Sequence, residues 1–343
     1  MVYSIMQFNL AHKLLSVDTN LNHIYYLIYA LVLDDIIKGK SKYNVKFLVE
    51  NDITKTPQLT QKFDFFWGRK GVKSIYYEHP LFPGVKAKLL LDMSKDTWTI
   101  TVNRSYYKFA KARLDNVWPP GLHLSNLITI KLLQEGIITL HCGSFSNKLS
   151  KGFLIFGPSD IGKSLTTFAA IKNGYSYHSE DLTFIDKDYI YTSPLISGQS
   201  DKIPDKDLLF HYDLFIKNTS GISMVLPFVK TVKSFRSFFR NVDLTKKAQP
   251  RYIFILEKGK DNIKTITKSE SIKKILLLNR LELTYFKDHL FRSYSYFNKD
   301  LNLEKLMNIE EELIDQIVGR SRCYVVTSDF PKNYLSLINT VAK

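Results

Sequence analysis

A glycine-rich segment at residues 157–164 constrains the fold of this chain more than any other feature. It reads Gly-Pro-Ser-Asp-Ile-Gly-Lys-Ser and matches the pattern G-x-x-x-x-G-K-[ST] at every specified position. The apolar run at 153–156 before it is typical of a buried strand. After it, Leu165 and Phe168 lie at helical spacing, and Gly174 stands where helices often end. Strand, glycine loop and helix in this order predict a phosphate-binding loop, whereas the pattern alone could be a chance match on a surface turn.

The residue types of this segment suit a polyphosphate. Glycine lets the backbone fold closely around phosphate oxygens, and the start of the following helix adds N–H groups and the positive end of its dipole. Lys163 would supply an ammonium group for the β- and γ-phosphates, and Ser164 a hydroxyl for Mg²⁺. We therefore predict binding of a nucleoside triphosphate with Mg²⁺. The residues predicted to contact the nucleotide are Gly157, Pro158, Ser159, Asp160, Ile161, Gly162, Lys163, Ser164 and Leu165.

Two adjacent acids, Glu180 and Asp181, follow the predicted loop helix and precede an apolar run at 182–185. Carboxylates within a strand-like run are costly to bury unless they hold a cation or a proton. In phosphate-binding-loop folds, an acid at the end of a strand beside the loop helps to hold the Mg²⁺ shell. We interpret the pair as a metal-binding or proton-accepting group, and the alternative is a surface turn with two solvated acids.

The net charge of the chain is +15, from 48 basic and 33 acidic side chains. Such a charge suits an acidic partner such as nucleic acid or a phosphorylated substrate, although a general bias in residue usage would also produce it. Residues 228–280 hold fourteen basic and four acidic side chains, a net charge of +10. This stretch is either a binding site for an acidic partner or nucleic acid, or a solvated helical face.

Two cysteines, Cys142 and Cys323, give neither a disulfide framework nor the spacing of a zinc site, which suits a reducing cytoplasm. The N-terminus shows no basic region followed by an apolar stretch, so we expect no signal peptide. The longest apolar run, 24–33, is about half of the roughly 20 residues that a spanning helix needs. We therefore expect a cytoplasmic protein that does not associate with a membrane.

The pattern of the chain predicts an α/β or α+β fold in two domains, at 1–125 and 126–343. The first domain is predicted to be mainly β or α+β, with some helix near 22–38. Its aromatic residues could form a ligand surface, but core packing is the commoner role. These aromatic residues are Phe63, Phe65, Phe66, Trp67, Tyr76 and Tyr77. Its predicted strands are 45–49, 74–77, 85–91 and 97–102.

In the second domain the apolar pattern predicts helices at 124–134 and 302–318, which end before Gly136 and at Gly319. A mobile polar connection is expected at 197–207, and a basic helical pattern covers 228–240. One continuous strand is predicted at 137–145, with Thr139 and His141 on one face. Further strands are predicted at 182–185, 190–193, 252–256 (before Glu257) and 323–326.

Three features at 140–181 resemble, in order and nearly in spacing, the kinase domain of the HPr kinase/phosphorylase family. Leu140-His141 precedes the loop by about fifteen residues, the loop itself is similar, and Gly174 precedes the pair Glu180-Asp181. The family belongs to the P-loop kinases that are similar to ATP-dependent phosphoenolpyruvate carboxykinase. The close resemblance covers about 45 residues. It implies a P-loop kinase domain of this type at 126–343, after a mainly β N-terminal domain.

The resemblance also implies roles for individual residues. Glu180 would take the proton from a serine hydroxyl, Asp181 and Ser164 would place Mg²⁺, and His141 would lie near the transferred phosphate, with Lys163 on the phosphates. The implied cofactors are ATP and Mg²⁺. The implied reaction is transfer of the γ-phosphoryl group to a hydroxyl, most often the serine of a protein or peptide.

The chain departs from the family pattern at two positions, since Glu180 replaces an Asp and Asp160 replaces a Gly. An extra methylene moves the carboxylate by roughly an ångström, which is enough to disturb catalytic positioning. The chain also lacks the Glu-Ile-Arg-Gly segment of the bacterial bifunctional enzymes, so the resemblance gives no support for their phosphorylase activity or their hexamer. Two alternatives stay open: a kinase acting on a nucleic-acid hydroxyl, and a nucleotide-sensing module without phosphoryl transfer.

Overall fold

The computed structural model describes residues 5–11, 14–27, 29–32, 41–112, 121–193, 195, 243 and 246–342. The chain divides into two compact units, each built from segments that are distant in sequence. Unit 1 comprises Met1–Ile128, Asp213–Arg236 and Tyr285–Lys305, and unit 2 comprises Thr129–Tyr212, Ser237–Thr284 and Leu306–Lys343. In the described part there are two large mixed sheets and seven α-helices, a mixed composition compatible with an α+β class.

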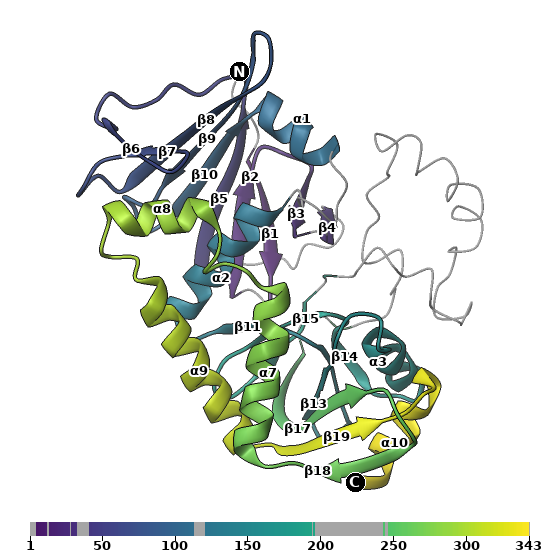
Figure 1. The fold of residues 1–343 in the computed structure, drawn as a ribbon. Helices are drawn as coiled ribbons and strands as arrows, with labels where there is room; N and C mark the ends of the chain where they lie inside the picture. The colour runs from purple at the N-terminus through teal and green to yellow at the C-terminus, as the bar shows by residue number, and fades with distance from the viewer. Residues whose placement is uncertain are drawn as a thin grey trace. The chain divides into compact units, whose positions relative to one another are not determined.

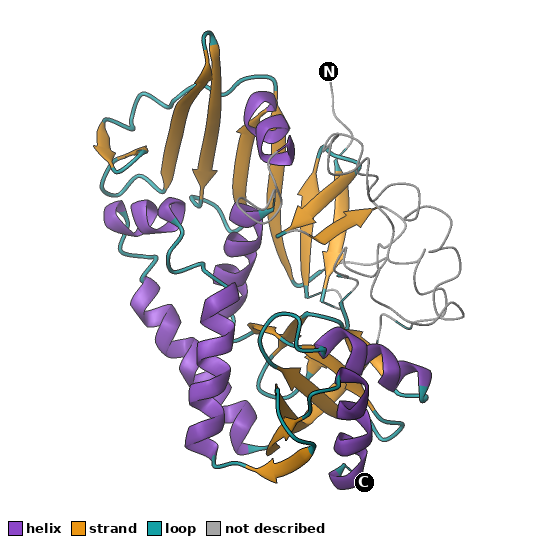
Figure 2. Ribbon diagram, turned by 45° about the vertical axis from the view of Figure 1, so that its right-hand side comes forward, coloured by secondary structure: helices purple, strands orange, loops and turns teal. Residues whose placement is uncertain are grey.

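An eight-stranded sheet forms the core of unit 1 (Figures 1 and 2). Its strands, in spatial order, are β1 (Met6–Leu10), β2 (Leu15–Thr19), β5 (Tyr43–Glu50), β10 (Trp98–Asn103), β9 (Val85–Asp92), β8 (Ser74–Phe82), β7 (Phe66–Gly68) and β6 (Gln61–Phe63). The pairs β2–β5 and β5–β10 are parallel, and the other pairs are antiparallel. In β5 the buried residues Val45, Phe47 and Val49 alternate with partly exposed ones, as expected for a sheet with one buried face.

Two helices of unit 1 pack on this sheet. The helix α1 (Arg104–Ala112) directly follows β10 and contacts β9 and β10. The helix α8 (His289–Phe297) comes from the C-terminal half of the chain and contacts β7 and β8. Gly68 makes room for α8, because a Cβ there would lie 2.3 Å from Cδ2 of Phe297. The sheet of unit 1 is therefore completed by a helix that begins more than 200 residues after the end of the strands β7 and β8 that it contacts.

The predicted helix near 22–38 is wrong for the part that the structure describes. This stretch forms the two-stranded hairpin β3 (His23–Tyr26) and β4 (Tyr29–Val32), while 33–40 lie outside the described residues. The residue types explain the outcome, since Ile, Tyr and Val favour strands over helices. The four strands predicted at 45–49, 74–77, 85–91 and 97–102 are confirmed as β5, β8, β9 and β10.

A nine-stranded mixed sheet forms the core of unit 2. Its main path is β11 (Ile138–His141), β15 (Leu182–Ile185), β16 (Ile190–Tyr191), β17 (Lys247–Glu257), β13 (Lys151–Phe156), β12 (Gly143–Ser146) and β14 (Ser176–Ser179). Beyond this path β19 (Arg322–Thr327) pairs with β17, and β18 (Asn262–Thr265) pairs with β19. The central strands β13, β17 and β19 run parallel to one another, so their carboxyl ends lie at one edge of the sheet.

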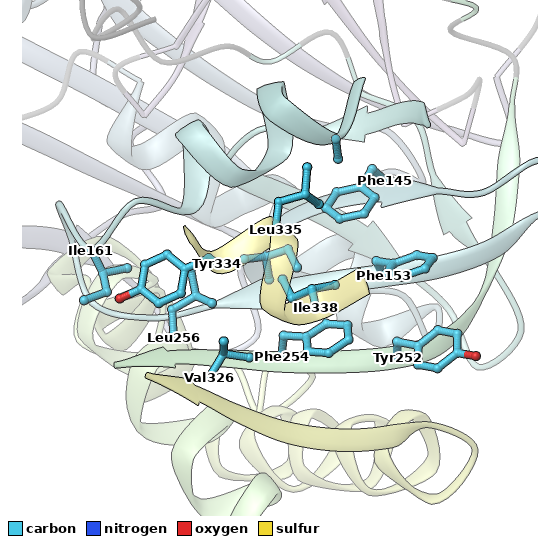
Figure 3. Packing of buried hydrophobic residues seen from close by; sticks show 12 residues of the cluster. Phe145, Phe153, Ile161, Tyr252, Phe254, Leu256, Val326, Tyr334, Leu335 and Ile338 are labelled. Atoms are coloured by element: carbon cyan, nitrogen blue, oxygen red, sulfur yellow. The ribbon is translucent and has the colours of Figure 1, made fainter. Parts of the chain in front are cut away.

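One face of this sheet carries a cluster of buried apolar residues under the helices α3 (Lys163–Lys172) and α10 (Tyr334–Val341). Figure 3 shows Phe153 and Phe254 of the central strands close to Tyr334 and Ile338 of α10. Ile161, which lies in the glycine-rich segment, belongs to the same cluster. The core of unit 2 therefore holds one side chain of that segment in place.

Two further helices, α7 (Lys268–Glu282) and α9 (Leu303–Gly319), lie side by side in both views (Figures 1 and 2). The guanidinium of Arg280 in α7 donates a hydrogen bond to the Glu310 carboxylate in α9 at 2.9 Å. The helix predicted at 302–318 is confirmed as α9, and the one predicted at 124–134 as α2 (Leu122–Gln134). The polar connection at 197–207 and the basic pattern at 228–240 lie outside the described residues.

The single strand predicted at 137–145 is wrong, because the chain breaks at Cys142 into β11 and β12. The two halves have different partners: β11 pairs with β15, whereas β12 pairs with β13 and β14. The carbonyl of Cys142 accepts a hydrogen bond from the Thr183 hydroxyl at 2.7 Å instead of joining a ladder. The strands predicted at 182–185, 190–193, 252–256 and 323–326 are confirmed as β15, β16, β17 and β19.

Candidate functional site

The glycine-rich segment connects β13 to α3, as the sequence predicts. The backbone has positive φ at Gly157 (155°), Asp160 (61°) and Gly162 (115°). A Cβ at Gly157 would lie 2.8 Å from Cγ2 of Ile161, and one at Gly162 would lie 2.7 Å from Cβ of Pro331. Both glycines are therefore required by conformation and by space, which makes the loop a tightly turned, glycine-dependent structure.

The helix α3 begins without a side-chain cap. Gly162 is its N-cap residue, no side chain caps its first N–H groups, and its first turn contains no acid. The first turn of a helix leaves N–H groups without helical partners, and the helix dipole adds positive charge there. The carbonyl of Gly162 accepts hydrogen bonds from the N–H and the hydroxyl of Thr166, both at 2.9 Å. The loop and the start of α3 together form a geometry that suits an anion.

Lys163 is buried, and its ammonium group is folded back over the loop. Its Nζ donates hydrogen bonds to the carbonyl oxygens of Gly157 at 2.9 Å and Pro158 at 3.2 Å. These carbonyls are neutral acceptors. A phosphate oxygen can replace them, because its hydrogen bond with the ammonium group is charge-assisted and therefore stronger. Ser164 and Leu165 are half-buried in the first turn of α3. The residues predicted to hold a triphosphate therefore lie together and fit such a group.

The acid pair forms a turn between β14 and β15. The Ser179 hydroxyl closes this turn by donating a hydrogen bond to the Leu182 carbonyl at 2.7 Å. Glu180 is only 2% exposed, and the side chain of Asp181 is 17% exposed. The surface turn with solvated acids is therefore excluded for Glu180.

His141 contacts this turn from the end of β11. Its Nε2 lies 2.9 Å from Oδ1 of Asp181, and the His141 residue is 7% exposed. The pairing β11–β15 brings the two side chains together, because His141 lies opposite Leu182 in the register. Two of the residues singled out in the sequence, 40 positions apart, thus make a direct contact.

The acid pair lies close to the loop helix. A Cβ at Gly143 would lie 2.4 Å from Oγ1 of Thr167 in α3 and 3.0 Å from the Glu180 carbonyl. Gly143 therefore fills the narrow space between α3 and the backbone of the acid pair. Only a residue without a side chain permits this approach.

Cys142 lies at the break between β11 and β12, and its thiol is buried. Burial raises its pKa to about 12, a hydrogen bond from Thr183 lowers it, and the Asp181 and Lys163 charges act on it in opposite directions. The thiol is therefore protonated at physiological pH and unreactive.

A buried hydrogen-bond network that starts in α7 holds the backbone of His141. The Asn279 side chain accepts a hydrogen bond from the His141 N–H at 2.9 Å and donates one to Glu310 at 2.7 Å. Glu310 is fully buried, and Arg280 neutralises it through Nε at 2.9 Å. A buried carboxylate is tolerated when it is paired and hydrogen-bonded in this way. The sequence interpretation did not include Asn279, Arg280 or Glu310.

Two more contacts lie at the same edge of the sheet. The Ser159 hydroxyl donates a hydrogen bond to the Glu282 carboxylate at 3.0 Å. Glu257 ends β17, the parallel neighbour of β13, and forms an ion pair with Lys274 at 2.8 Å. A hydrogen bond to Glu257 raises the pKa of Lys274, so this lysine stays charged.

The sequence analysis did not predict the helix α7. The pattern Thr267-x-x-Glu270 could have indicated where this helix begins, because the Thr267 side chain accepts a hydrogen bond from the Glu270 N–H.

The donor set of the site suits Mg²⁺ with a phosphate ligand. Among the residues that the structure describes, no group of three or more His, Cys, Asp or Glu side chains is arranged to hold a metal ion. Mg²⁺ commonly takes one or two carboxylates and completes its shell with phosphate oxygens and water. Ser164 and Asp181 would be the protein groups for such an ion.

No protein-family model and no curated protein matches this chain. Within the described part of the chain, no helix has both the length and the apolar character needed to cross a membrane.

Proposed function

We propose that this chain is a P-loop kinase of the HPr kinase type, which transfers the γ-phosphoryl group of ATP to a hydroxyl. The observation that carries the proposal is the position of the acid pair beside the loop helix, with His141 on Asp181 and the Glu180 carbonyl next to α3. A phosphate loop alone would suit any nucleotide-binding protein. The acid pair adds the groups that a phosphoryl transfer to a hydroxyl needs.

The loop and the first turn of α3 hold the triphosphate in this proposal. The ammonium of Lys163 moves from the carbonyls of Gly157 and Pro158 to the phosphate oxygens, a displacement confined to one flexible side chain. Mg²⁺, when bound, would neutralise charge on the β- and γ-phosphates, with Ser164 and Asp181 as its protein ligands. The His141 contact fixes the orientation of the Asp181 carboxylate.

Glu180 accepts the proton of the attacking hydroxyl. Its burial keeps bulk water away from the carboxylate, and the tight turn at 179–182 fixes its backbone. The acceptor we propose is the serine of a protein or peptide, which rests on the resemblance at 140–181. Catalysis then consists of positioning and charge neutralisation.

The test removes, in separate variants, the phosphate-binding lysine and the proposed proton acceptor. Lys163→Ala and Glu180→Gln should each abolish transfer of labelled phosphate from ATP to serine peptides. Glu180→Gln should keep nucleotide binding, measured by calorimetry, because the substitution leaves the loop unchanged. Glu312→Gln, an exposed glutamate on α9, is the matched control and should behave as wild type. Full turnover by Glu180→Gln would refute the assignment of the proton acceptor.

A second candidate is a nucleotide-sensing module without phosphoryl transfer. Glu180 and Asp160 favour it, since one lengthens the acid side chain and the other places a carboxylate inside the loop at φ 61°. A sensor would bind ATP with Mg²⁺ and leave every acceptor unlabelled in the same assay, including free serine, peptides and nucleic-acid ends.

A further inference from the structure

Unit 1 carries a group of exposed aromatic rings at the β6–β7 turn and on α8. The ring of Phe63 stacks on that of Tyr296, with centroids 3.9 Å apart and planes inclined by 10°. Phe65 contacts the ring of His289 edge-on at 6.2 Å. Phe63, Phe65 and Tyr296 are 37%, 55% and 65% exposed. We call the five residues Phe63, Phe65, His289, Arg292 and Tyr296 the α8 surface.

Beyond the contacts of Phe63 with Tyr296 and Phe297, α8 has a separate buried side. Its buried side includes Leu290, Phe291, Tyr294 and Phe297. The ring of Phe297 packs against Gly68. The residues at 289, 292 and 296 follow at intervals of three and four, so they line the opposite, exposed side of the helix. Grouped exposed rings are uncommon on a monomer and mark a binding surface.

The surroundings of the α8 surface are basic. Residues 61–73 and 286–300 contain seven exposed lysines and arginines against three acids. These segments carry a net charge of +4 with histidine neutral, and each acid already has a partner within unit 1: Asp64 contacts His289, Asp288 contacts His123 and Asp300 pairs with Lys73. The partner that this charge attracts is therefore anionic.

We propose that the α8 surface binds single-stranded nucleic acid. Stacked aromatic faces suit unpaired bases of any sequence, and basic side chains such as Arg292 suit the phosphates between them. His289 and Tyr296 are about 10 Å apart along the helix, at about 1.5 Å per residue, a length that suits two or three successive bases. An acidic peptide would satisfy the charge but gives no reason for flat, mutually stacked rings. The proposal is independent of the kinase function, since it involves neither ATP nor residues of unit 2.

The test measures binding of fluorescein-labelled oligonucleotides to the full chain by anisotropy, without ATP. A 12-nucleotide oligouridine and its DNA counterpart should both bind, because stacking and phosphate contacts are common to the two polymers. Tyr296→Ala should weaken binding roughly 5- to 150-fold, the loss associated with one stacked base. Tyr296→Phe should bind as wild type. Arg292→Ala should reduce the slope of log affinity against log salt concentration by about one, because one phosphate contact is lost.

Phe82→Ala is the matched control, since Phe82 is 65% exposed on the same sheet but lies outside the α8 surface. Thermal melts identify any variant that fails to fold, and the salt dependence of Arg292→Ala keeps the test decisive if Tyr296→Ala does so. The proposal fails if no oligonucleotide binds at 50 mM salt, or if an abasic oligomer binds as tightly as oligouridine. It also fails if Tyr296→Ala changes the oligomeric state of the chain while its oligonucleotide affinity stays that of wild type, because the surface would then be a protein interface.

Discussion

His178 lies two residues before the acid pair, and its ring is completely buried. One ring nitrogen lies 2.7 Å from the Thr192 hydroxyl and the other 2.9 Å from the Ser146 hydroxyl. Burial lowers the pKa of His178 to about 3, with a smaller contribution from the charge of Lys246. The ring is therefore neutral at physiological pH and joins β14 to β12. It contrasts with His141, whose ring contacts the Asp181 carboxylate.

His178 should make the stability of the chain depend on pH. In the unfolded chain its pKa is about 6.5, so below that pH the unfolded state binds a proton that the folded state does not. Stability should therefore fall as pH drops from 6.5 toward 3, by up to about 1.4 kcal/mol per pH unit from this residue. Urea unfolding of the wild type and His178→Gln at pH 7, 5.5 and 4.5 measures the effect. The variant should lose less stability than the wild type over this range, and equal losses would contradict the assignment.

At the residue scale, the sequence was informative where the site residues are close together in the chain. The loop at 157–164 and the pair Glu180-Asp181 form a short pattern whose chemistry can be derived from residue types and spacing. Asn279 and Glu282 could not be found in this way, because their contacts with His141 and Ser159 span 138 and 123 residues. An asparagine and a glutamate on a helix carry no local signal of such a role.

The helix α7 is the element that connects the parts of the candidate site. Along its length, Lys274 pairs with Glu257 at the end of β17, Asn279 holds the His141 backbone, and Glu282 accepts from Ser159 in the loop. Its buried residues Ser271, Ile275 and Asn279 follow at intervals of four and face inward. One rigid helix therefore fixes three segments that the sequence separates widely.

Removing the Asn279 side chain should damage both stability and the proposed transfer. Asn279→Ala leaves the buried His141 N–H without its acceptor and takes one donor from Glu310, which should cost about 1–3 kcal/mol. The His141 backbone would lose its support, so kcat for peptide phosphorylation should fall while the affinity for ATP stays close to wild type. Thermal unfolding, calorimetry and steady-state kinetics measure these three quantities.

Leu277→Ala is the control for this prediction, since Leu277 is 63% exposed on the same helix. It should leave stability and turnover unchanged. A role for Asn279 limited to stability would appear as a lower melting temperature with unchanged kcat at a temperature where the variant is fully folded.

At the element scale, the predictions from the sequence were wrong where the local pattern does not show how strands pair in the folded protein. The apolar run at 137–145 has the alternation of one strand, but its two halves pair with different partners and the chain turns at Cys142. The stretch near 22–38 was interpreted as helix although its Ile, Tyr and Val residues favour strands. The long periodic pattern of α9 was predicted correctly because a single buried face determines it, and that of α2 because its apolar residues extend over more than three turns.

At the scale of the whole molecule, the two compact units are interleaved in sequence. Within the residues that the structure describes, unit 1 consists of the N-terminal part together with a segment, Tyr285–Lys305, that the chain supplies after most of unit 2. A sequence boundary between 125 and 126 stays a prediction. Composition does not indicate that a distant helix completes an N-terminal sheet, because α8 is amphipathic like α9 and α10 of unit 2.

This interleaving predicts that the N-terminal part does not fold properly by itself. A fragment of residues 1–128 lacks α8, so the sheet surface at β7 and β8 that receives it, including the space over Gly68, would be exposed to water. The fragment should bind a hydrophobic dye more strongly than the full chain and unfold with low cooperativity. Adding residues 285–305 through a flexible linker should restore a cooperative transition. In the linked protein, Phe297→Ala should reverse that restoration and Tyr296→Ala should not, because Phe297 is buried over Gly68 whereas Tyr296 is 65% exposed and only stacks on Phe63 at the edge of the sheet. A fragment of 1–128 that melts as cooperatively as the linked protein would show that α8 contributes nothing to the folding of unit 1.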